Sequence, residues 1–385
     1  MKILINLNIL KYPLTGIGYY TYHIICELLN RNVELKAIKN GKILDKKAIV
    51  ELVGQYNSSI SEQNSKKKLK RFLINTISKI YGTRYLKFFI ENWRLTNSLK
   101  KLAREDYIYF EPCFLPFPYK GKIITVIHDL SFLIHPEYHP ADRVNYLSGR
   151  LGDSIKDSSK IVVDSYAILN ELYQYYPETR SKSDVLYLGV DPSFIPQQEK
   201  DCSTILNKFG LQYKGFILSV ATIEPRKNLS RLVDAYLQLP ENLRSCYPLV
   251  LVGDSGWKNN ELFNKINTAQ IIVTGYLSDN ELKKIYASAL LFVYPSLYEG
   301  FGLPIIESMA SGAAVITSNC GAMAEVAGKA AYLVDPYSVK EITDACSKVL
   351  ADSKFRDDLV QAGIKRANEF RWANTVDQLL KYMRE

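Results

Sequence analysis

Two glutamates in the C-terminal half of the chain are separated by seven residues that begin with a glycine-rich turn. The stretch from Glu299 to Glu307 reads Glu-Gly-Phe-Gly-Leu-Pro-Ile-Ile-Glu. Glycines let a backbone approach a ligand closely, and the free N–H groups that open a helix bind phosphate or hydroxyl oxygens. We therefore expect the amides of Phe301, Gly302 and Leu303 to contact a ligand. Glu299 in the loop and Glu307 in the helix can then address different parts of one long ligand, such as a sugar and a ribose.

A second candidate group is the adjacent cation pair Arg226-Lys227, which follows a strand-like run and precedes a helical one. Arginine offers a planar fork of N–H donors and lysine a mobile point charge, so the pair suits a diphosphate. Taken alone, two neighbouring cations are usually a solvated surface feature. Their place at the carboxyl end of a predicted strand, where ligands bind in parallel α/β sheets, favours the functional interpretation.

The loop after the first predicted strand contains Gly16 and Gly18 in the run Pro-Leu-Thr-Gly-Ile-Gly, ahead of a helical stretch. Such a loop exposes amides and the positive end of a helix dipole, which suits a phosphate. The alternative is a tight structural turn. The spacing is not Gly-x-Gly-x-x-Gly, so an NAD site is disfavoured.

Three of the four histidines lie close together in sequence, at His128, His135 and His139. Zinc is one interpretation, but Pro136 and Pro140 make a helical pairing of His135 with His139 improbable, and we expect no metal site. His135 and His139 then have structural or acceptor-side roles. His128 ends a predicted strand, which favours a residue that lines a cleft over a buried core histidine.

The elements that must position these residues form an alternating pattern of strands and helices. Most strand-like runs are rich in Ile, Val and Leu, as expected where helices cover both faces of a parallel sheet. The predicted strands are 2–7, 106–110, 122–128, 160–164 and 184–188, then 216–220, 248–252, 270–274, 290–294, 313–317 and 331–334. A capping box at Ser278 to Glu281 opens a helix, and Pro304 opens another. The pattern predicts two doubly wound α/β domains, 1–195 and 196–370, with a last helix at 371–385 that returns to the first domain.

Length and composition agree with this organisation. A chain of 385 residues is too long for one ordinary core, and 47% hydrophobic with 23% charged residues is typical of a globular protein rather than a disordered one. No apolar run is long enough to cross a bilayer, and the first residues read as a strand rather than a signal peptide. The six cysteines form no Cys-x-x-Cys pair, which favours a cytosolic protein with reduced thiols.

The net charge of +9 predicts attraction to a polyanion. Many of the cations lie in the stretch from Lys66 to Arg104, where they are interleaved with aromatic residues at roughly helical spacing. A basic amphipathic helix of this kind can lie on an anionic membrane surface. The equal alternative is a solvated helix docked by its apolar stripe. A nucleic-acid partner is not expected, because no recognised RNA or DNA motif accompanies the stretch.

Taken together, the motifs resemble the retaining glycosyltransferases of family four, which have the GT-B fold. The resemblance is carried by Glu-Pro-Arg-Lys-Asn at 224–228, Val-Thr-Gly-Tyr-Leu at 273–277, the Glu299-to-Glu307 spacing within 295–307, and His-Asp-Leu at 128–130. It spans nearly the whole chain, and the motifs occur in the expected order. It implies two Rossmann-like domains facing across a cleft, an N-terminal one for the acceptor and a C-terminal one for a nucleotide-sugar donor.

The resemblance also implies roles for the residues of the C-terminal half. Arg226 and Lys227 would neutralise the donor diphosphate. Glu307 would accept hydrogen bonds from the ribose, and Glu299, with the amides that follow it, would hold the donor sugar. No metal or other cofactor would be needed.

Four further positions take their roles from the same resemblance. Gly16 would bring the N-terminal loop to the phosphate, and His128 would face the anomeric carbon. Tyr276 and Leu277 would line the base pocket. Tyr19 departs from the polar or basic residue that is common after Gly-x-Gly in such proteins, which leaves the donor contacts of this loop open.

The block from His128 to Pro140 and the Pro-Leu-Thr-Gly-Ile-Gly loop are similar to mannosyl- or rhamnosyltransferases of bacterial surface-polysaccharide and lipopolysaccharide synthesis. This similarity favours a GDP-sugar donor, such as GDP-mannose, and a lipid-linked glycan acceptor at the cytoplasmic membrane face, where the enzyme would be peripheral. Two alternatives are a nucleotide-sugar epimerase of the same architecture and a non-catalytic glycan- or membrane-binding protein that retains the fold. No pattern in the sequence indicates an oligomeric state.

Overall fold

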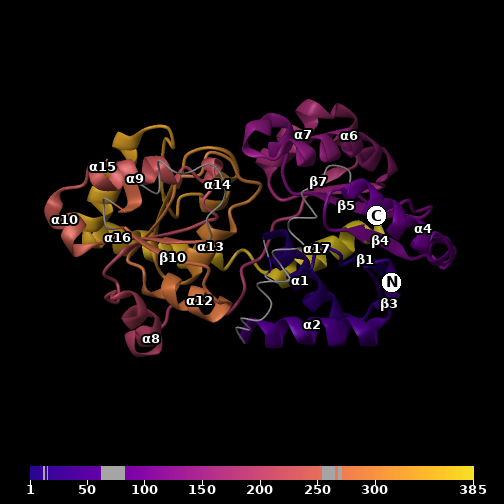
Figure 1. The fold of residues 1–385 in the computed structure, drawn as a ribbon, viewed down its shortest axis with the longest axis horizontal. Coiled ribbons are helices and arrows are strands. Elements are labelled where there is room, and N and C mark those ends of the chain that lie inside the picture. The colour runs from indigo at the N-terminus through magenta and orange to yellow at the C-terminus, as the bar shows by residue number, and fades with distance from the viewer. Residues whose placement is uncertain (12–13, 15, 62–82, 254–264, 268–270) are drawn as a thin grey trace. The chain divides into compact units, whose positions relative to one another are not determined.

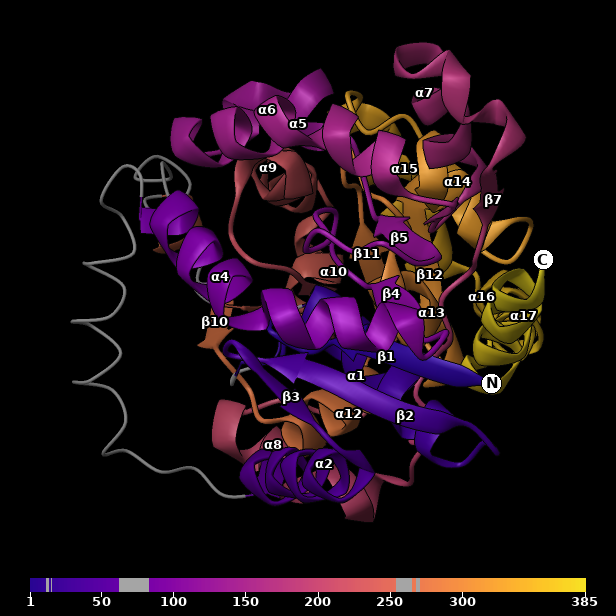
Figure 2. The ribbon, with the colours of Figure 1, turned by 90° about the vertical axis from the view of Figure 1, so that its right-hand side faces the viewer.

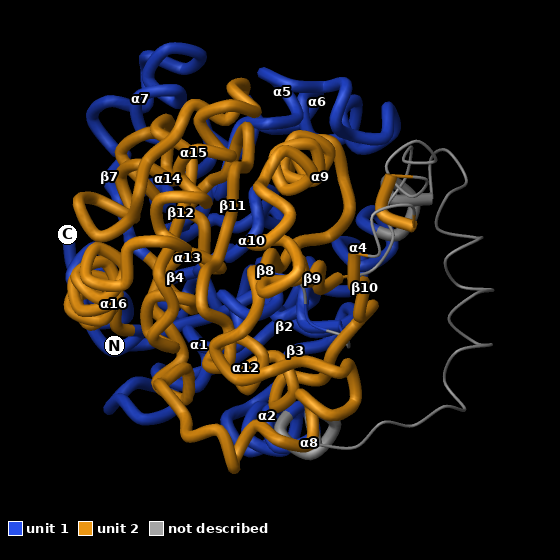
Figure 3. The backbone as a smooth tube through the Cα atoms, turned by 90° about the vertical axis from the view of Figure 1, so that its left-hand side faces the viewer, with its two compact units in different colours: residues 1–164, 168–187, 372–385 blue, residues 165–167, 188–371 orange. Residues whose placement is uncertain are grey.

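The computed structural model describes residues 1–11, 14, 16–61, 83–253, 265–267 and 271–385 (Figure 1). It divides into two compact units, which Figure 3 colours separately. Unit 1 comprises residues 1–164, 168–187 and 372–385, and unit 2 comprises residues 165–167 and 188–371. Pro13 and Thr15 of the first glycine loop lie outside the described residues, as does the basic stretch from Lys66 to residue 82.

Unit 1 is built on a seven-stranded sheet with the order β3-β2-β1-β4-β5-β6-β7. The strands are β1 (Lys2–Asn6), β2 (Glu34–Lys39), β3 (Lys42–Leu44), β4 (Ile108–Glu111), β5 (Ile123–Ile127), β6 (Lys160–Val163) and β7 (Ser183–Val185). All neighbours pair in parallel except β2 and β3, which form an antiparallel hairpin. Figure 2 shows β2, β1 and β4 at the centre of this unit. Strand β5 is buried along its whole length, as expected for a strand covered on both faces.

The helices of unit 1 connect and cover these strands. They are α1 (Gly16–Leu29), α2 (Lys46–Ser61), α4 (Thr83–Arg104), α5 (Ser131–Ile134), α6 (Ala141–Asp157), α7 (Tyr166–Tyr175, of which 166–167 belong to unit 2) and α17 (Trp372–Arg384), with 3-10 turns at Pro136–Tyr138 and Pro177–Ser181. The C-terminal helix α17 packs alongside α1 (Figure 1). There the Trp372 ring stacks on the ring of His23 at 4.9 Å between centroids.

Unit 2 contains an all-parallel six-stranded sheet with the order β10-β9-β8-β11-β12-β13. The strands are β8 (Ile217–Val220), β9 (Leu249–Val252), β10 (Ile272–Gly275), β11 (Leu291–Tyr294), β12 (Ala314–Ser318) and β13 (Tyr332–Val334). Chain order reverses between β8 and β11, which lie side by side at the centre of the sheet. In doubly wound folds, this switch point at the carboxyl ends of the strands is where ligands bind.

The helices of unit 2 are α8 (Glu199–Phe209), α9 (Leu229–Leu237), α10 (Glu241–Cys246), α12 (Asp279–Ser288), α13 (Leu303–Ala310), α14 (Gly321–Ala327), α15 (Val339–Ala351) and α16 (Ser353–Ala367), with a 3-10 turn at Pro225–Lys227. Alternate strand residues, such as Leu291 and Val293, pack with α9 and α15 in one hydrophobic core. The intervening residues point to the opposite face, because side chains alternate along a strand. The capping box of α12 is confirmed: Ser278 and Glu281 bond each other's backbone amides.

The sequence analysis placed a strand at or beside every strand of the two sheets except β2 and β3. The segment Glu34–Lys39 has a charged residue at its first, third and last positions, and none of these three is buried, so it lacks the continuous apolar run of its neighbours. Pro304 is the second rather than the first residue of α13, which begins at Leu303. Among the described helices, none has both the length and the apolarity that crossing a bilayer requires.

Candidate active site

The two loops that leave the switch point of the unit 2 sheet carry the strongest sequence motifs. Residues 221–228 follow β8, and residues 295–302 follow β11. The loops are tied together, because Leu297 N–H donates to the carbonyl of Arg226 at 2.8 Å. Asn228 adds two bonds from its side-chain amide, to the carbonyls of Pro295 at 2.9 Å and Pro336 at 2.6 Å. Asn228 is buried and left-handed, with φ of 58°, and it ends the turn that presents the two cations.

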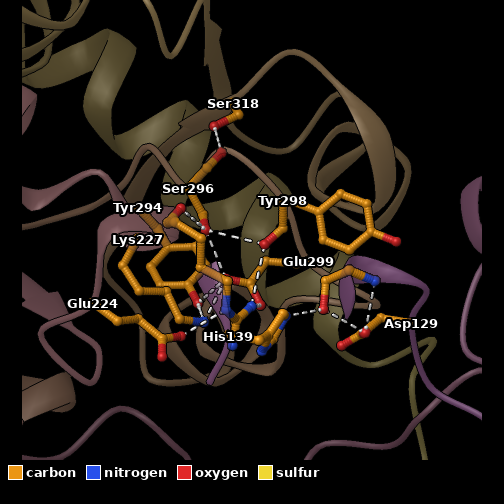
Figure 4. Close-up of polar contacts among 11 residues, drawn as sticks. Asp129, His139, Glu224, Lys227, Tyr294, Ser296, Tyr298, Glu299 and Ser318 are labelled. Atoms are coloured by element: carbon orange, nitrogen blue, oxygen red, sulfur yellow. Dashed lines mark hydrogen bonds and ion pairs between the residues drawn. The ribbon is translucent and has the colours of Figure 1, made fainter. Parts of the chain in front are cut away.

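Glu299 is the centre of a polar cluster at this edge of the sheet (Figure 4). Its Oε1 lies 2.5 Å from Nζ of Lys227 and 2.7 Å from both the Tyr294 hydroxyl and Ser296 Oγ. Its Oε2 accepts a hydrogen bond from the guanidinium of Arg226 at 2.9 Å. The two cations predicted to bind a diphosphate and the carboxylate predicted to bind a sugar are therefore direct neighbours.

Arg226 is held by a second carboxylate as well. Its Nε lies 2.6 Å from Glu224, and its Nη1 also donates to the carbonyl of Tyr298 at 3.2 Å. The sequence analysis quoted Glu224 within its motif but gave it no role. Glu224 and Glu299 thus place two negative charges beside the two cations.

The charges in this cluster shift its titration. Burial alone would raise the pKa of Glu299, but the charges of Arg226 and Lys227, with hydrogen bonds from Lys227 and Ser296, outweigh burial and lower the pKa to about 2. Burial lowers the pKa of Lys227, and the negative charge of Glu299 opposes that shift. Glu299 is thus a fixed anion rather than a proton donor or acceptor near neutral pH.

Helix α13 begins immediately beyond this cluster. Gly302 is its N-cap and has φ of 102°, a conformation that residues with a Cβ rarely adopt. The turn directs the first amides of the helix outward from its N-terminus, where they suit phosphate or hydroxyl oxygens. Phe301 is buried and its ring packs edge-on against Phe370, so it anchors the turn, and Leu303 is the first helical residue.

Glu307 lies on α13, one turn beyond the glycine. Burial raises its pKa to about 7, and the negative charges of Asp279 and Asp191 contribute to the increase. Its environment therefore differs from that of Glu299, where cations dominate. The two glutamates of the motif have opposite pKa shifts, which suits different contacts with one ligand.

Tyr276 and Leu277, which the family resemblance places at the base pocket, follow strand β10. Leu277 is buried, whereas the side chain of Tyr276 is exposed. Both come directly after the left-handed Gly275.

His128 departs from the prediction of a residue that lines a cleft. It follows β5 in unit 1, and its ring is buried, with 6% of its surface exposed. Its Nδ1 lies 2.8 Å from Asp164, which follows β6, and its Nε2 lies 2.7 Å from the carbonyl of Pro112, which follows β4. Burial disfavours the charged ring, but the carboxylate of Asp164 outweighs burial and raises the pKa of His128. Both nitrogens face oxygen atoms that accept hydrogen bonds, an arrangement that favours the doubly protonated ring.

The remaining predicted residues of unit 1 are Gly16, His135 and His139. Gly16 is the exposed first residue of α1. His139 Nε2 lies 2.8 Å from Ser131 Oγ, and His135 lies 3.3 Å from Glu137 at the surface. Within the residues that the structure describes, no cluster of three His, Cys, Asp or Glu side chains is arranged to hold a metal ion.

Two doubly wound units, one of which carries a cation pair, a carboxylate and a helix N-terminus at its switch point, define a glycosyltransferase of the GT-B class. The fold of the crystallised Anabaena protein Alr3699/HepE in complex with UDP and glucose is similar, with a TM-score of 0.71 over 100% of this chain and 99% of that one at 16% identity. Residues 204–366 match the family of glycosyl transferases group 1. The chain is also 34% identical over 386 residues to O-antigen chain mannosyltransferase B of Escherichia coli, covering 99% of this chain and 98% of that protein. The chain belongs to the family of glycosyl transferases group 1 and is a glycosyltransferase.

A second relative matches over part of its length. The serotype-specific mannosyltransferase WbdA of Escherichia coli is 32% identical over 265 residues, which cover 66% of this chain and 32% of WbdA. Membership of a glycosyltransferase family favours transfer over the epimerase and non-catalytic alternatives.

Proposed function

We propose that the chain transfers a mannosyl residue, or a related deoxyhexose, from a GDP-sugar to a lipid-linked glycan, with retention of anomeric configuration and without a metal ion. The observation that carries the proposal is the contact of Arg226 and Lys227 with Glu299 at the switch point of unit 2. The full-length similarity to O-antigen chain mannosyltransferase B supports the choice of mannose and of an acceptor in polysaccharide synthesis.

The proposed mechanism follows from charge. Transfer passes through an oxocarbenium-like transition state while negative charge develops on the leaving diphosphate. Glu224 and Glu299 hold Arg226 and Lys227 at the switch point, so both cations can turn to the diphosphate when the donor binds and are in place before the charge develops. The amides that open α13 add further donors. Front-face substitution then needs no pair of flanking carboxylates, and a donor phosphate oxygen helps to deprotonate the acceptor hydroxyl.

Donor identity is tested by a thermal-shift and calorimetric screen against GDP-, UDP- and dTDP-sugars, because ligand binding to the native state raises the melting temperature. GDP-mannose is expected to give the largest shift. Transfer is then measured with radiolabelled GDP-mannose and a polyprenyl-diphosphate-linked glycan, with and without EDTA. Equal stabilisation by all three nucleotides, or transfer abolished by EDTA, would contradict the donor or the metal-independent mechanism.

We further propose that the enzyme works as a peripheral protein on the cytoplasmic membrane surface, which it contacts through α4. The helix has two distinct faces. Phe88, Leu95 and Leu99 face the core of unit 1, where the Phe88 ring stacks on Phe117. Phe89 and Trp93, one turn apart on the other face, are 68% and 75% exposed.

Basic side chains continue the outer face of α4 toward its C-terminus. Lys100, Lys101 and Arg104 are exposed, and the acidic Glu91 of the same helix is buried. Exposed aromatic residues beside cations are the combination that inserts at an anionic interface. Flotation with vesicles that contain or lack anionic lipid tests this contact. Binding is expected to the anionic vesicles alone, and failure to bind either kind would discard the proposal.

A further inference from the structure

We propose that Tyr294 is a positioning residue, whose hydroxyl holds the carboxylate of Glu299 in place when the donor diphosphate draws Arg226 and Lys227 towards itself. The inference rests on the proposed function of this site. It concerns a residue that neither the sequence motifs nor the predicted contacts included.

Tyr294 is set rigidly in the sheet. It is the last residue of β11, at the carboxyl end of the switch point, and it is 2% exposed. Its ring stacks on Phe292 at 5.9 Å between centroids, and its carbonyl accepts a hydrogen bond from Thr317 of β12 at 2.8 Å. The hydroxyl is therefore fixed by the sheet rather than by a mobile loop.

The direction of each hydrogen bond at the Tyr294 hydroxyl is determined by its partners. Nζ of Lys227 lies 2.9 Å away and can only donate, whereas Oε1 of ionised Glu299 lies 2.7 Å away and can only accept. The tyrosine proton must therefore point to Glu299. Burial, reinforced by the charge of Glu299, raises the pKa of Tyr294, so the hydroxyl keeps its proton.

Ser296 is a less committed donor to the same oxygen. Its hydroxyl also lies within bonding distance of the carbonyls of Arg226, at 3.0 Å, and Tyr298, at 3.5 Å, and it has one proton for three acceptors. Among the described residues, the Tyr294 hydroxyl is thus a neutral donor whose proton has one acceptor, the carboxylate of Glu299.

Binding of a diphosphate changes the balance around Glu299. The charged groups that face it are Arg226 and Lys227, with Glu224 behind Arg226. When the cations turn to the phosphates, Glu299 loses charged donors at the moment it must orient the sugar. The Tyr294 hydroxyl remains and keeps the carboxylate ionised and directed, because a hydrogen bond to the charged form favours that form.

The test is Tyr294→Phe, which removes the hydroxyl and keeps the ring, with Tyr236→Phe as the matched control. Tyr236 is a buried tyrosine of α9 in the same unit, with its hydroxyl 3.3 Å from the carbonyl of Arg244. For Tyr294→Phe, kcat/KM for GDP-mannose should fall about tenfold, the size expected for one hydrogen bond to a charged group. Calorimetric affinity for GDP alone should not fall, because GDP lacks the sugar and Lys227 leaves the Tyr294 hydroxyl when it turns to the diphosphate. The acid limb of the pH profile of kcat, where Glu299 becomes protonated, should move to higher pH, because Glu299 loses a hydrogen bond that favours its charged form.

The outcomes separate this inference from the proposed function. A wild-type chain that binds GDP-mannose but transfers nothing would refute the proposed transfer. An active wild type whose Tyr294→Phe variant matches Tyr236→Phe in kcat/KM and in its pH profile would refute the role of Tyr294. Parallel loss of GDP affinity and kcat/KM, with an unmoved acid limb, would show a merely structural residue and would also overturn the inference.

Discussion

Lys227 and Glu299 form a buried ion pair in which Nζ lies 2.5 Å from Oε1. Each side chain comes from a different loop at the switch point of the unit 2 sheet, so the pair joins the two loops as well as the two charges. Arg226 pairs with the other oxygen of the same carboxylate. The two cations proposed to bind the diphosphate are therefore placed by the residue proposed to hold the sugar.

Replacing Lys227 with alanine tests the contribution of this cation to catalysis. Glu299 keeps Arg226, Tyr294 and Ser296 as partners, so we expect the variant to fold. Removing a fixed donor that stabilises developing charge lowers turnover on the order of 10²-fold. Steady-state kinetics with GDP-mannose measure the loss. Lys340→Ala, on an exposed helix face of the same unit, is the control, and turnover reduced less than tenfold would count against the assignment.

The depressed pKa of Glu299 makes stability depend on pH in a defined window. Since its folded pKa is about 2 against an ordinary 4.5, its contribution is complete above pH 4.5 and is lost as the pH falls toward 2. The full contribution is on the order of 3 kcal/mol. Urea unfolding between pH 6 and pH 3 should show a smaller loss of stability for Glu299→Gln than for the wild type. Parallel curves for both proteins would contradict the pairing.

Glu307 has the opposite shift, and its effect should appear in ligand binding. Its raised pKa, about 7, leaves the carboxyl largely protonated at pH 6 and ionised at pH 8. A ribose hydroxyl donates best to the ionised form, so GDP affinity should rise up to about tenfold between these pH values. Calorimetry at both pH values measures the change. Glu307→Gln removes this titration but leaves that of the phosphate, so a variant with the wild-type pH dependence would exclude Glu307.

The alternating fold and the site of unit 2 could be predicted because their signals are local. Leu249–Val252 and Leu291–Tyr294 are continuous apolar runs, and the cation pair and the glycine turn lie in the loops that follow predicted strands. The strand Glu34–Lys39 was missed because three charged residues among six interrupt its apolar positions, so the sequence does not distinguish it from a surface segment.

Side-chain partners that come from separate strands were beyond local patterns. Asp164 reaches His128 because β5 and β6 are neighbours, and nothing in the 35 residues between them marks the pair. The same holds for Tyr294 and Lys227, which are brought together by the pairing of β8 with β11. A strand-end histidine therefore could not be assigned as buried without the register of the sheet.

The effect of the Asp164 carboxylate on the pKa of His128 is tested with Asp164→Asn. The raised pKa of His128 depends on the Asp164 carboxylate, and without it burial dominates and the pKa should fall below its ordinary 6.5. The chain has four histidines, so their ring signals can be resolved by NMR titration. The stability given by the charged ring is present below pH 6.5 and is lost as the pH rises through the folded pKa. A His128 titration that is the same in both proteins would contradict the assignment.

Trp93→Ala tests the outer face of α4. Trp93 is among the most exposed apolar side chains described, and its ring is free to enter a lipid interface without disturbing the core face that contains Leu95 and Leu99. Loss of one large side chain from the interface should weaken binding to anionic vesicles about tenfold, with an unchanged melting temperature. Tyr337→Ala, which removes an exposed aromatic ring from unit 2, is the matched control. Vesicle sedimentation measures both variants. If they bind equally, or if Trp93→Ala binds as the wild type does, α4 is not the membrane contact, because insertion of this ring is what distinguishes the helix from a solvated surface.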